Sequence, residues 1–222
     1  LRSLVGSEMC IRDRNIPENV KKVEERNPAI LFKCVKNPTE VENIRIAEIK
    51  DSVAHVRFMK WLKENVGKET ITEMSASDKL DEFRAEMGGF IRPSFGPISA
   101  FGEHSAIVHY SSSPETDVEL HEGTFLMTDT GAGFYEGSTD ITRTYAFGEV
   151  SQIMKDHFTL VAISNLNLAS PIFKKGCCGM NFDYLARKPF WDRGLDFNHG
   201  TGHGVGYLLN IHEGPAGFRY TY

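Results

Sequence analysis

The chain has 222 residues, of which 41% are hydrophobic and 25% are charged, as is ordinary for a globular protein. A net charge of -5 argues against a nucleic-acid-binding protein, which usually carries a basic surface. No apolar run approaches the roughly 18 residues that a transmembrane helix needs.

The four cysteines indicate neither a disulfide framework nor a cysteine zinc site. Cys177 and Cys178 are adjacent, Cys10 and Cys34 are isolated, and no Cys-x-x-Cys pair occurs. This arrangement favours a reducing, cytoplasmic compartment.

The N-terminal segment does not read as part of a fold. Residues 1–14, "LRSLVGSEMCIRDR", show no clear period and resemble translated sequencing-adapter read-through, so we set them aside as non-native. Residues 15–36 are charged and end in "PAILFKCVK", which we interpret as a short apolar strand. We expect the chain to be a fragment of a longer protein.

Two helices are predicted next. Residues 37–67 begin with a capping-box pattern formed by Asn37 and Glu40, and their apolar residues recur near a 3.6-residue period. Residues 72–89 follow, with Thr72 as the cap and two glycines as the stop. We interpret the alternating acids and lysines of this second helix as a solvated face.

The middle of the chain is β-branched and aromatic, which predicts strands. We expect strands at 106–110, 124–135 and 138–147, the last two joined as a hairpin through "YEG". Helices are predicted again at 151–170 and at 181–194, the latter capped by Asn181. Helices, then strands, then helices indicate an α+β fold rather than repeated βαβ units.

The stretch 198–215, "NHGTGHGVGYLLNIHEGP", combines three histidines with five glycines. Each glycine would cost roughly 1 kcal/mol in a helix interior, so the stretch must be extended or looped. In a strand, His199 and His203 would face the same way. His212 needs a bend or bulge to join them, and glycine permits one.

Asp129 and Asp140 lie on the two arms of the predicted hairpin, although isolated aspartates are disfavoured in strands. Two facing carboxylates would repel each other unless a divalent metal lay between them. Gly131 and Gly133 could supply the bulge that brings the side chains together. The alternative is a pair of turn-capping or solvent-facing aspartates, and the residues alone leave the two interpretations about equal.

His203 favours a metal site, since oxygen ligands with one imidazole suit Mn, Co or Zn better than Ca or Mg. A lone strand histidine is more often a hydrogen-bonded core residue, but His203 lies among glycines and further histidines. His109, in "AIVHYSSSP", is a further candidate, and its commoner role would be a hydrogen bond within a loop. No His-Glu-x-x-His, Gly-x-Ser-x-Gly or Walker pattern occurs.

Four motifs resemble the Xaa-Pro aminopeptidases of the pita-bread metallopeptidase family. They are "NPTEVENIRIAEIKDSVAH", "AIVHYSSSPE", "TDTGAGFYEGSTDITRTYAFG" and "LDFNHGTGHGVGYLLNIHEGP". Their order and spacing match across roughly residues 23–222, and "HGTGHGVG" followed by "NIHEGP" looks more like aminopeptidase P than prolidase or methionine aminopeptidase.

The resemblance implies a site with two divalent metals, usually manganese. It implies that Asp129 is a ligand of one metal, that Asp140 bridges both, and that His203 is the single histidine ligand. A water or hydroxide that bridges the metals would attack the peptide bond before a proline, so no covalent nucleophile is needed.

The resemblance also assigns the other histidines. His109 and His212 match histidines that contact substrate and handle protons, and His199 matches one that shapes the pocket. A neutral histidine can hydrogen-bond a developing oxyanion or pass a proton to the prolyl nitrogen. Peptides that contain proline are the implied substrates, and a homodimer is the implied assembly.

One departure from the family is serious. The resemblance implies two further glutamate ligands, one in a segment like "NEPGYY", and no such segment stands before Tyr222, nor does Glu213 match. We therefore expect residues 15–36 to be the tail of an absent N-terminal domain and 37–222 to be a truncated catalytic domain. We expect this chain alone to be inactive or nearly so.

Other functional classes remain as alternatives. Some pita-bread domains have lost their metal and serve as binding modules, and creatinase-like relatives do metal-free chemistry. Such relatives usually lack the aspartate pair and the histidine ligand, whereas Asp129, Asp140 and His203 are all present here. A structural α+β domain with chance histidines is the third alternative.

Overall fold

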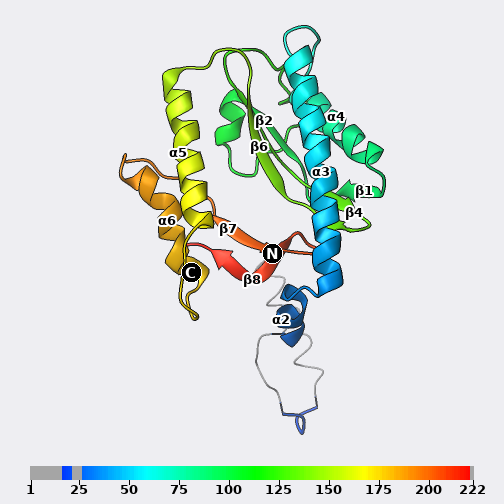
Figure 1. Ribbon diagram of the computed structural model, residues 1–222, viewed down its shortest axis with the longest axis vertical. Coiled ribbons are helices and arrows are strands. Elements are labelled where there is room, and N and C mark those ends of the chain that lie inside the picture. Colours follow the sequence, from blue (N-terminus) through cyan, green and yellow to red (C-terminus); the bar gives the residue numbers. More distant parts are fainter. Residues whose placement is uncertain (1–16, 22–26, 221–222) are drawn as a thin grey trace.

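The computed structural model describes residues 17–21 and 27–220. The segment 1–14, set aside above, and Cys10 within it lie outside the described residues. Helices α3 (Pro38–Asn65), α4 (Glu73–Glu86), α5 (Gln152–Ala169) and α6 (Gly179–Trp191) flank short strands, which confirms the α+β prediction (Figure 1). No helix of the described part is long and apolar enough to span a membrane.

The first long helix begins where its sequence predicts. The Asn37 side chain accepts the backbone N–H of Glu40, and the Glu40 carboxylate accepts the N–H of Asn37, so both halves of the capping box form. Helix α4 is likewise capped by Thr72, whose hydroxyl accepts the Ser75 N–H and whose backbone N–H donates to the Ser75 hydroxyl. Both caps satisfy backbone donors that a helix end leaves free.

The buried face of α3 is not its most apolar one. Large aliphatic side chains such as Ile49, Val53 and Val56 are exposed. The buried residues instead are small, aromatic or polar, and they recur every three or four positions: Ala47, Asp51, Ala54, His55, Phe58 and Leu62. The solvated face expected for α4 is also only partly correct, because Glu73 and Arg84 are buried.

Two three-stranded sheets share one hairpin. Strands β2 (Ile98–Phe101), β3 (Phe125–Thr130) and β6 (Ile141–Ala146) form one sheet in the order β2-β3-β6, entirely antiparallel. Strands β1 (Phe90–Pro93), β4 (Ala132–Phe134) and β5 (Gly137–Ser138) form the other in the order β1-β4-β5. The predicted hairpin is confirmed, with its turn at Tyr135 and Glu136, but it passes from one sheet into the other and back.

The main core fills the space between α3, α4 and the sheet β2-β3-β6. Helix α5 lies on the other side of this sheet (Figure 1). The Phe158 ring of α5 lies 6.0 Å from the Phe125 ring of β3. The core cluster is mostly aliphatic and aromatic: Ala54, Phe58, Leu62, Ile71, Ala76, Leu80, Phe101, Leu120, Leu126, Tyr145 and Phe147.

Three local predictions are wrong. The segment "PAILFKCVK" forms helix α2 (Pro28–Cys34), because Asn27 caps it and Pro28 stands at its first position. The expected strand at 106–110 is instead the end of the 3-10 helix η1 (Gly102–Ala106) and a turn. Asn181 is not the cap of α6. It lies three residues inside and accepts the backbone N–H of Cys178.

The buried side chain of His55 makes the free energy of unfolding depend on pH. Burial lowers the pKa of His55 from 6.5 to about 4, with Arg84 adding to the effect and Asp51 opposing it. The unfolded chain therefore binds more protons than the folded chain between these values. We expect the free energy of unfolding to fall as pH drops from 6.5 to 4, by up to about 3 kcal/mol from this group.

Urea titrations at pH 6.5, 5.5 and 4.5 measure that dependence. The His55→Gln variant should lose part of the slope, whereas His157→Gln, at an exposed position on α5, should keep it. Equal slopes for wild type and His55→Gln would contradict the prediction.

Candidate metal centre

The hairpin leaves one sheet just after Asp129 and returns to it just after Asp140. Asp129 pairs with Thr142 near the end of β3, and Asp140 lies between β5 and β6 rather than inside a strand as predicted. A Cβ atom at Gly131 would overlap the carbonyl oxygen of Thr139, so only glycine lets these segments pass so closely. The Thr142 hydroxyl donates to the Asp129 carboxylate at 2.7 Å.

The glycine-rich stretch folds as the antiparallel pair β7 (Gly202–Val205) and β8 (His212–Phe218). The predicted bulge is present: the pairing shifts between His203 and Gly204. A Cβ atom at Gly204 would meet the carbonyl oxygen of Glu213, so the glycine allows the close approach of the two strands. The return between the strands is closed by a bond from Gly206 N–H to the Ile211 carbonyl at 2.8 Å.

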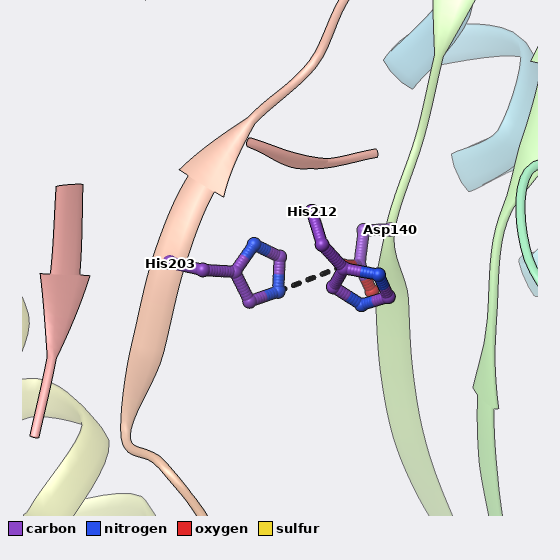
Figure 2. Close-up of side chains that lie close together, drawn as sticks. All are labelled: Asp140, His203 and His212. Carbon is purple, nitrogen blue, oxygen red and sulfur yellow. Dashed lines mark ion pairs between the residues drawn. The ribbon is translucent and has the colours of Figure 1, made fainter. Parts of the chain in front are cut away.

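The hairpin and the β7–β8 pair bring three candidate side chains together, as Figure 2 shows. His203 Nε2 lies 3.3 Å from Asp140 Oδ2, and the rings of His203 and His212 are 4.5 Å apart. One potential ligand atom from each of Asp140, His203 and His212 lies within 4.8 Å of the others. A carboxylate with two imidazoles is a donor set that divalent transition metals accept.

The electrostatics of Asp140 fit a cation site. Burial raises the pKa of the Asp140 carboxyl, the charge of Asp129 raises it further, and His203 and His212 lower it. Asp129 is thus close enough to oppose ionisation of Asp140. A bound divalent cation would offset both the burial and the repulsion.

Three predicted site residues lie outside this group of three: Asp129, which is half-buried on β3, His109 and His199. His109 is exposed in the turn after η1, with φ +57°. His199 is exposed before β7 rather than in it, and its Nδ1 atom lies 2.7 Å from the Gly200 carbonyl oxygen. Glu213 is nearly buried and pairs with Lys33, 3.1 Å away, and with Lys36.

A cavity of about 440 Å³ adjoins the group between α2, α3 and the β7–β8 pair. Its walls include Glu48, Gly204 and Glu213. Gly204 and Glu213, which line the cavity, directly follow His203 and His212 in the chain.

The polar residues behind the aspartates were not predicted from the sequence. Asp51 and Arg84 are buried, and they reach Thr130 and Thr139, which stand next to Asp129 and Asp140. A usable signal existed in the sequence: Asp51 lies four residues from Ala47 and three from Ala54, on a face that is otherwise apolar or aromatic.

Comparison with known proteins supports a peptidase origin. The chain is 40% identical to a probable Xaa-Pro aminopeptidase P of Sordaria macrospora over 196 residues, which cover 87% of this chain and 32% of that protein. It is 38% identical to Xaa-Pro aminopeptidase 2 of Sus scrofa over 205 residues, which cover 92% of this chain and 30% of that protein. The chain thus spans about a third of the length of these relatives.

Solved structures agree in fold. The X-prolyl aminopeptidase of Caenorhabditis elegans, described as a cytosolic enzyme with a di-nuclear active site, matches with a TM-score of 0.83 and 36% identity over 88% of this chain and 32% of that chain. The prolidase of Pyrococcus furiosus matches with a TM-score of 0.72 and 27% identity over 85% and 53%. These likenesses confirm the pita-bread fold. The model of metallopeptidase family M24 matches residues 42–221, and the chain therefore belongs to that family.

Proposed function

We propose that this chain is part of a metal-dependent exopeptidase that removes the N-terminal residue from peptides with proline in second position. The observation that carries the proposal is the convergence of Asp140, His203 and His212 within ligand distance of one another. Membership of a metallopeptidase family and similarity to Xaa-Pro aminopeptidases support it.

Asp129, Asp140 and His203 are the proposed ligands of two divalent cations. The 3.3 Å distance between His203 Nε2 and Asp140 Oδ2 suits two groups that face one ion. A donor set rich in carboxylate favours manganese, with zinc or cobalt as alternatives. The di-nuclear site of the C. elegans enzyme supports two ions rather than one.

The cations, when bound, would lower the pKa of a water molecule and polarise the peptide carbonyl. The residues of the chain supply the rest. His212, with its ring beside His203, is placed to donate a hydrogen bond to developing negative charge or to hand a proton to the prolyl nitrogen. His109 and His199 are exposed, and we propose that His109 contacts the peptide and that His199 shapes the pocket.

The setting of the enzyme follows from the same comparisons. We propose a cytoplasmic location, because the cysteines show no disulfide pattern and the C. elegans enzyme is described as cytosolic. We also propose a homodimer for the complete protein.

The first test is metal binding by the 222-residue chain. We expect Mn²⁺ to bind in a titration followed by the electron paramagnetic resonance of free Mn²⁺, and Asp140→Asn or His203→Gln to weaken binding by about 10-fold or more, because each removes a ligand. Matched controls are Asp156→Asn and His157→Gln on the exposed face of α5, which should bind as wild type. Wild type without Mn²⁺ binding would contradict the proposal and favour a metal-free binding module.

A variant of His212 distinguishes between two roles for this residue, metal ligand and proton-transfer group. We expect His212→Gln to change the Mn²⁺ dissociation constant by less than about threefold, in contrast to His203→Gln, if its role is in proton transfer. In a protein of the relatives' full length, the same variant should lower kcat for an Xaa-Pro peptide by about 100-fold or more. Loss of Mn²⁺ binding equal to that of His203→Gln would instead make His212 a ligand.

A further inference from the structure

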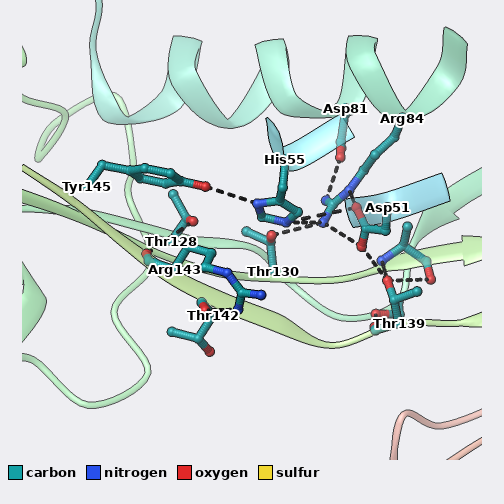
Figure 3. Close-up of polar contacts among 12 residues, drawn as sticks. Asp51, His55, Asp81, Arg84, Thr128, Thr130, Thr139, Thr142, Arg143 and Tyr145 are labelled. Carbon is teal, nitrogen blue, oxygen red and sulfur yellow. Dashed lines mark hydrogen bonds and ion pairs between the residues drawn. The ribbon is translucent and has the colours of Figure 1, made fainter. Parts of the chain in front are cut away.

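A buried ion pair lies behind the candidate metal centre, between α3 and α4 (Figure 3). Arg84 Nε donates to Asp51 Oδ1 at 2.8 Å, and Arg84 Nη2 donates to Asp51 Oδ2 at 3.2 Å. The two residues are 1% and 0% exposed. Taking both charges out of water costs several kcal/mol per ion, so stability alone is a weak reason for such a pair.

The pair reaches the hairpin at two threonines, one on each arm. Arg84 Nη2 donates to Thr130 Oγ1 at 2.9 Å, and the Thr139 hydroxyl donates to Asp51 Oδ2. Thr139 Oγ1 also accepts the Ala132 N–H at 2.8 Å, where the hairpin crosses between the sheets. One ion pair therefore ties together the two arms and the crossover.

Each threonine is the direct neighbour of a proposed ligand. Thr130 follows Asp129 and Thr139 precedes Asp140. Successive side chains of an extended strand point to opposite faces, and the burial of β3 alternates accordingly, with Thr130 buried and Asp129 half-buried. The ion pair thus holds the backbone at Thr130 and Thr139, each directly beside a proposed ligand, and at Thr130 it does so from the face of β3 opposite Asp129.

We propose that the Asp51–Arg84 pair is a positioning device that sets the spacing of the Asp129 and Asp140 carboxylates for metal binding, acting through Thr130 and Thr139. The inference rests on the proposed function, since it concerns the same metal ligands. The physical need is plain: the two carboxylates repel each other before any cation binds, so the backbone must resist their separation. Partners behind the ligands commonly tune metal affinity in this way.

The test removes single hydroxyl groups and leaves every ligand in place. Thr130→Val and Thr139→Val each break one bond to the pair, whereas Thr139→Ser keeps its hydroxyl. The matched control is Thr128→Val, the same change on the same buried face of β3, at a residue that makes no hydrogen bond to Asp51 or Arg84 among those the described residues form. Two quantities are measured: the Mn²⁺ dissociation constant and the midpoint of thermal unfolding.

We expect Thr130→Val and Thr139→Val to weaken Mn²⁺ binding by about 10-fold or more, and Thr139→Ser and Thr128→Val to stay within about threefold of wild type. Equal Mn²⁺ affinity in Thr139→Val, Thr130→Val and Thr128→Val would overturn the inference and leave the proposed function intact. A loss of Mn²⁺ affinity that only parallels the fall in the thermal unfolding midpoint across all four variants would also overturn the inference. Absence of Mn²⁺ binding by wild type would overturn the proposed function, and the inference with it.

Discussion

The rest of the structure depends on one buried charge pair, that of Asp51 with Arg84. It joins α3 and α4 to the hairpin at a depth where neither charge meets water. Leaving either charge alone there would cost more than the pair contributes, so the pair constrains which arrangements of α3, α4 and the hairpin are permitted. The apolar core around Phe58 and Leu126 supplies the driving force, while the charge pair selects the geometry.

A second buried carboxylate, that of Glu73 on α4, ties this helix to residues 101–110 in a similar way. Glu73, at the first position of α4, accepts the Phe101 N–H at 2.6 Å and the Tyr110 hydroxyl at 2.8 Å, and its Oε1 lies 2.9 Å from His104 Nδ1. These contacts fix both ends of the turn that contains His109. One helix thus anchors the candidate metal centre through Arg84 and the turn through Glu73.

The sequence was most informative where structure is local. The capping box at Asn37, the cap at Thr72 and the hairpin turn depend on residues a few positions apart, and all three are confirmed. The segment 28–34 was misjudged because a short apolar run suits a strand and a helix equally, and the cap at Asn27 decided the matter. The proximity of Asp140 to His203 spans 63 positions of sequence, so residue chemistry could suggest a shared metal site but only the family resemblance assigned both as ligands before the structure.

The buried face of α3 shows why the remaining residues escaped prediction. Periodicity drew attention to Ile49, Val53 and Val56, yet tertiary packing buries the face that holds Asp51 and His55. A charged residue on a helix is ordinarily solvated, and the local sign of burial at Asp51 is its position on the same face as Ala47 and Ala54. The burial of Asp51 is explained by its ion pair with Arg84.

The change of sheets within one hairpin has a thermodynamic consequence. Asp129 is the last residue but one of β3 in the sheet β2-β3-β6, and Asp140 stands where the chain returns from the sheet β1-β4-β5. Because Thr130, next to Asp129, pairs with Ile141, next to Asp140, the distance between the carboxylates depends on how the chain leaves and re-enters the sheet β2-β3-β6. By linkage, an ion that favours one distance favours the backbone geometry that gives it, and a contact that shifts this geometry shifts the affinity for the ion.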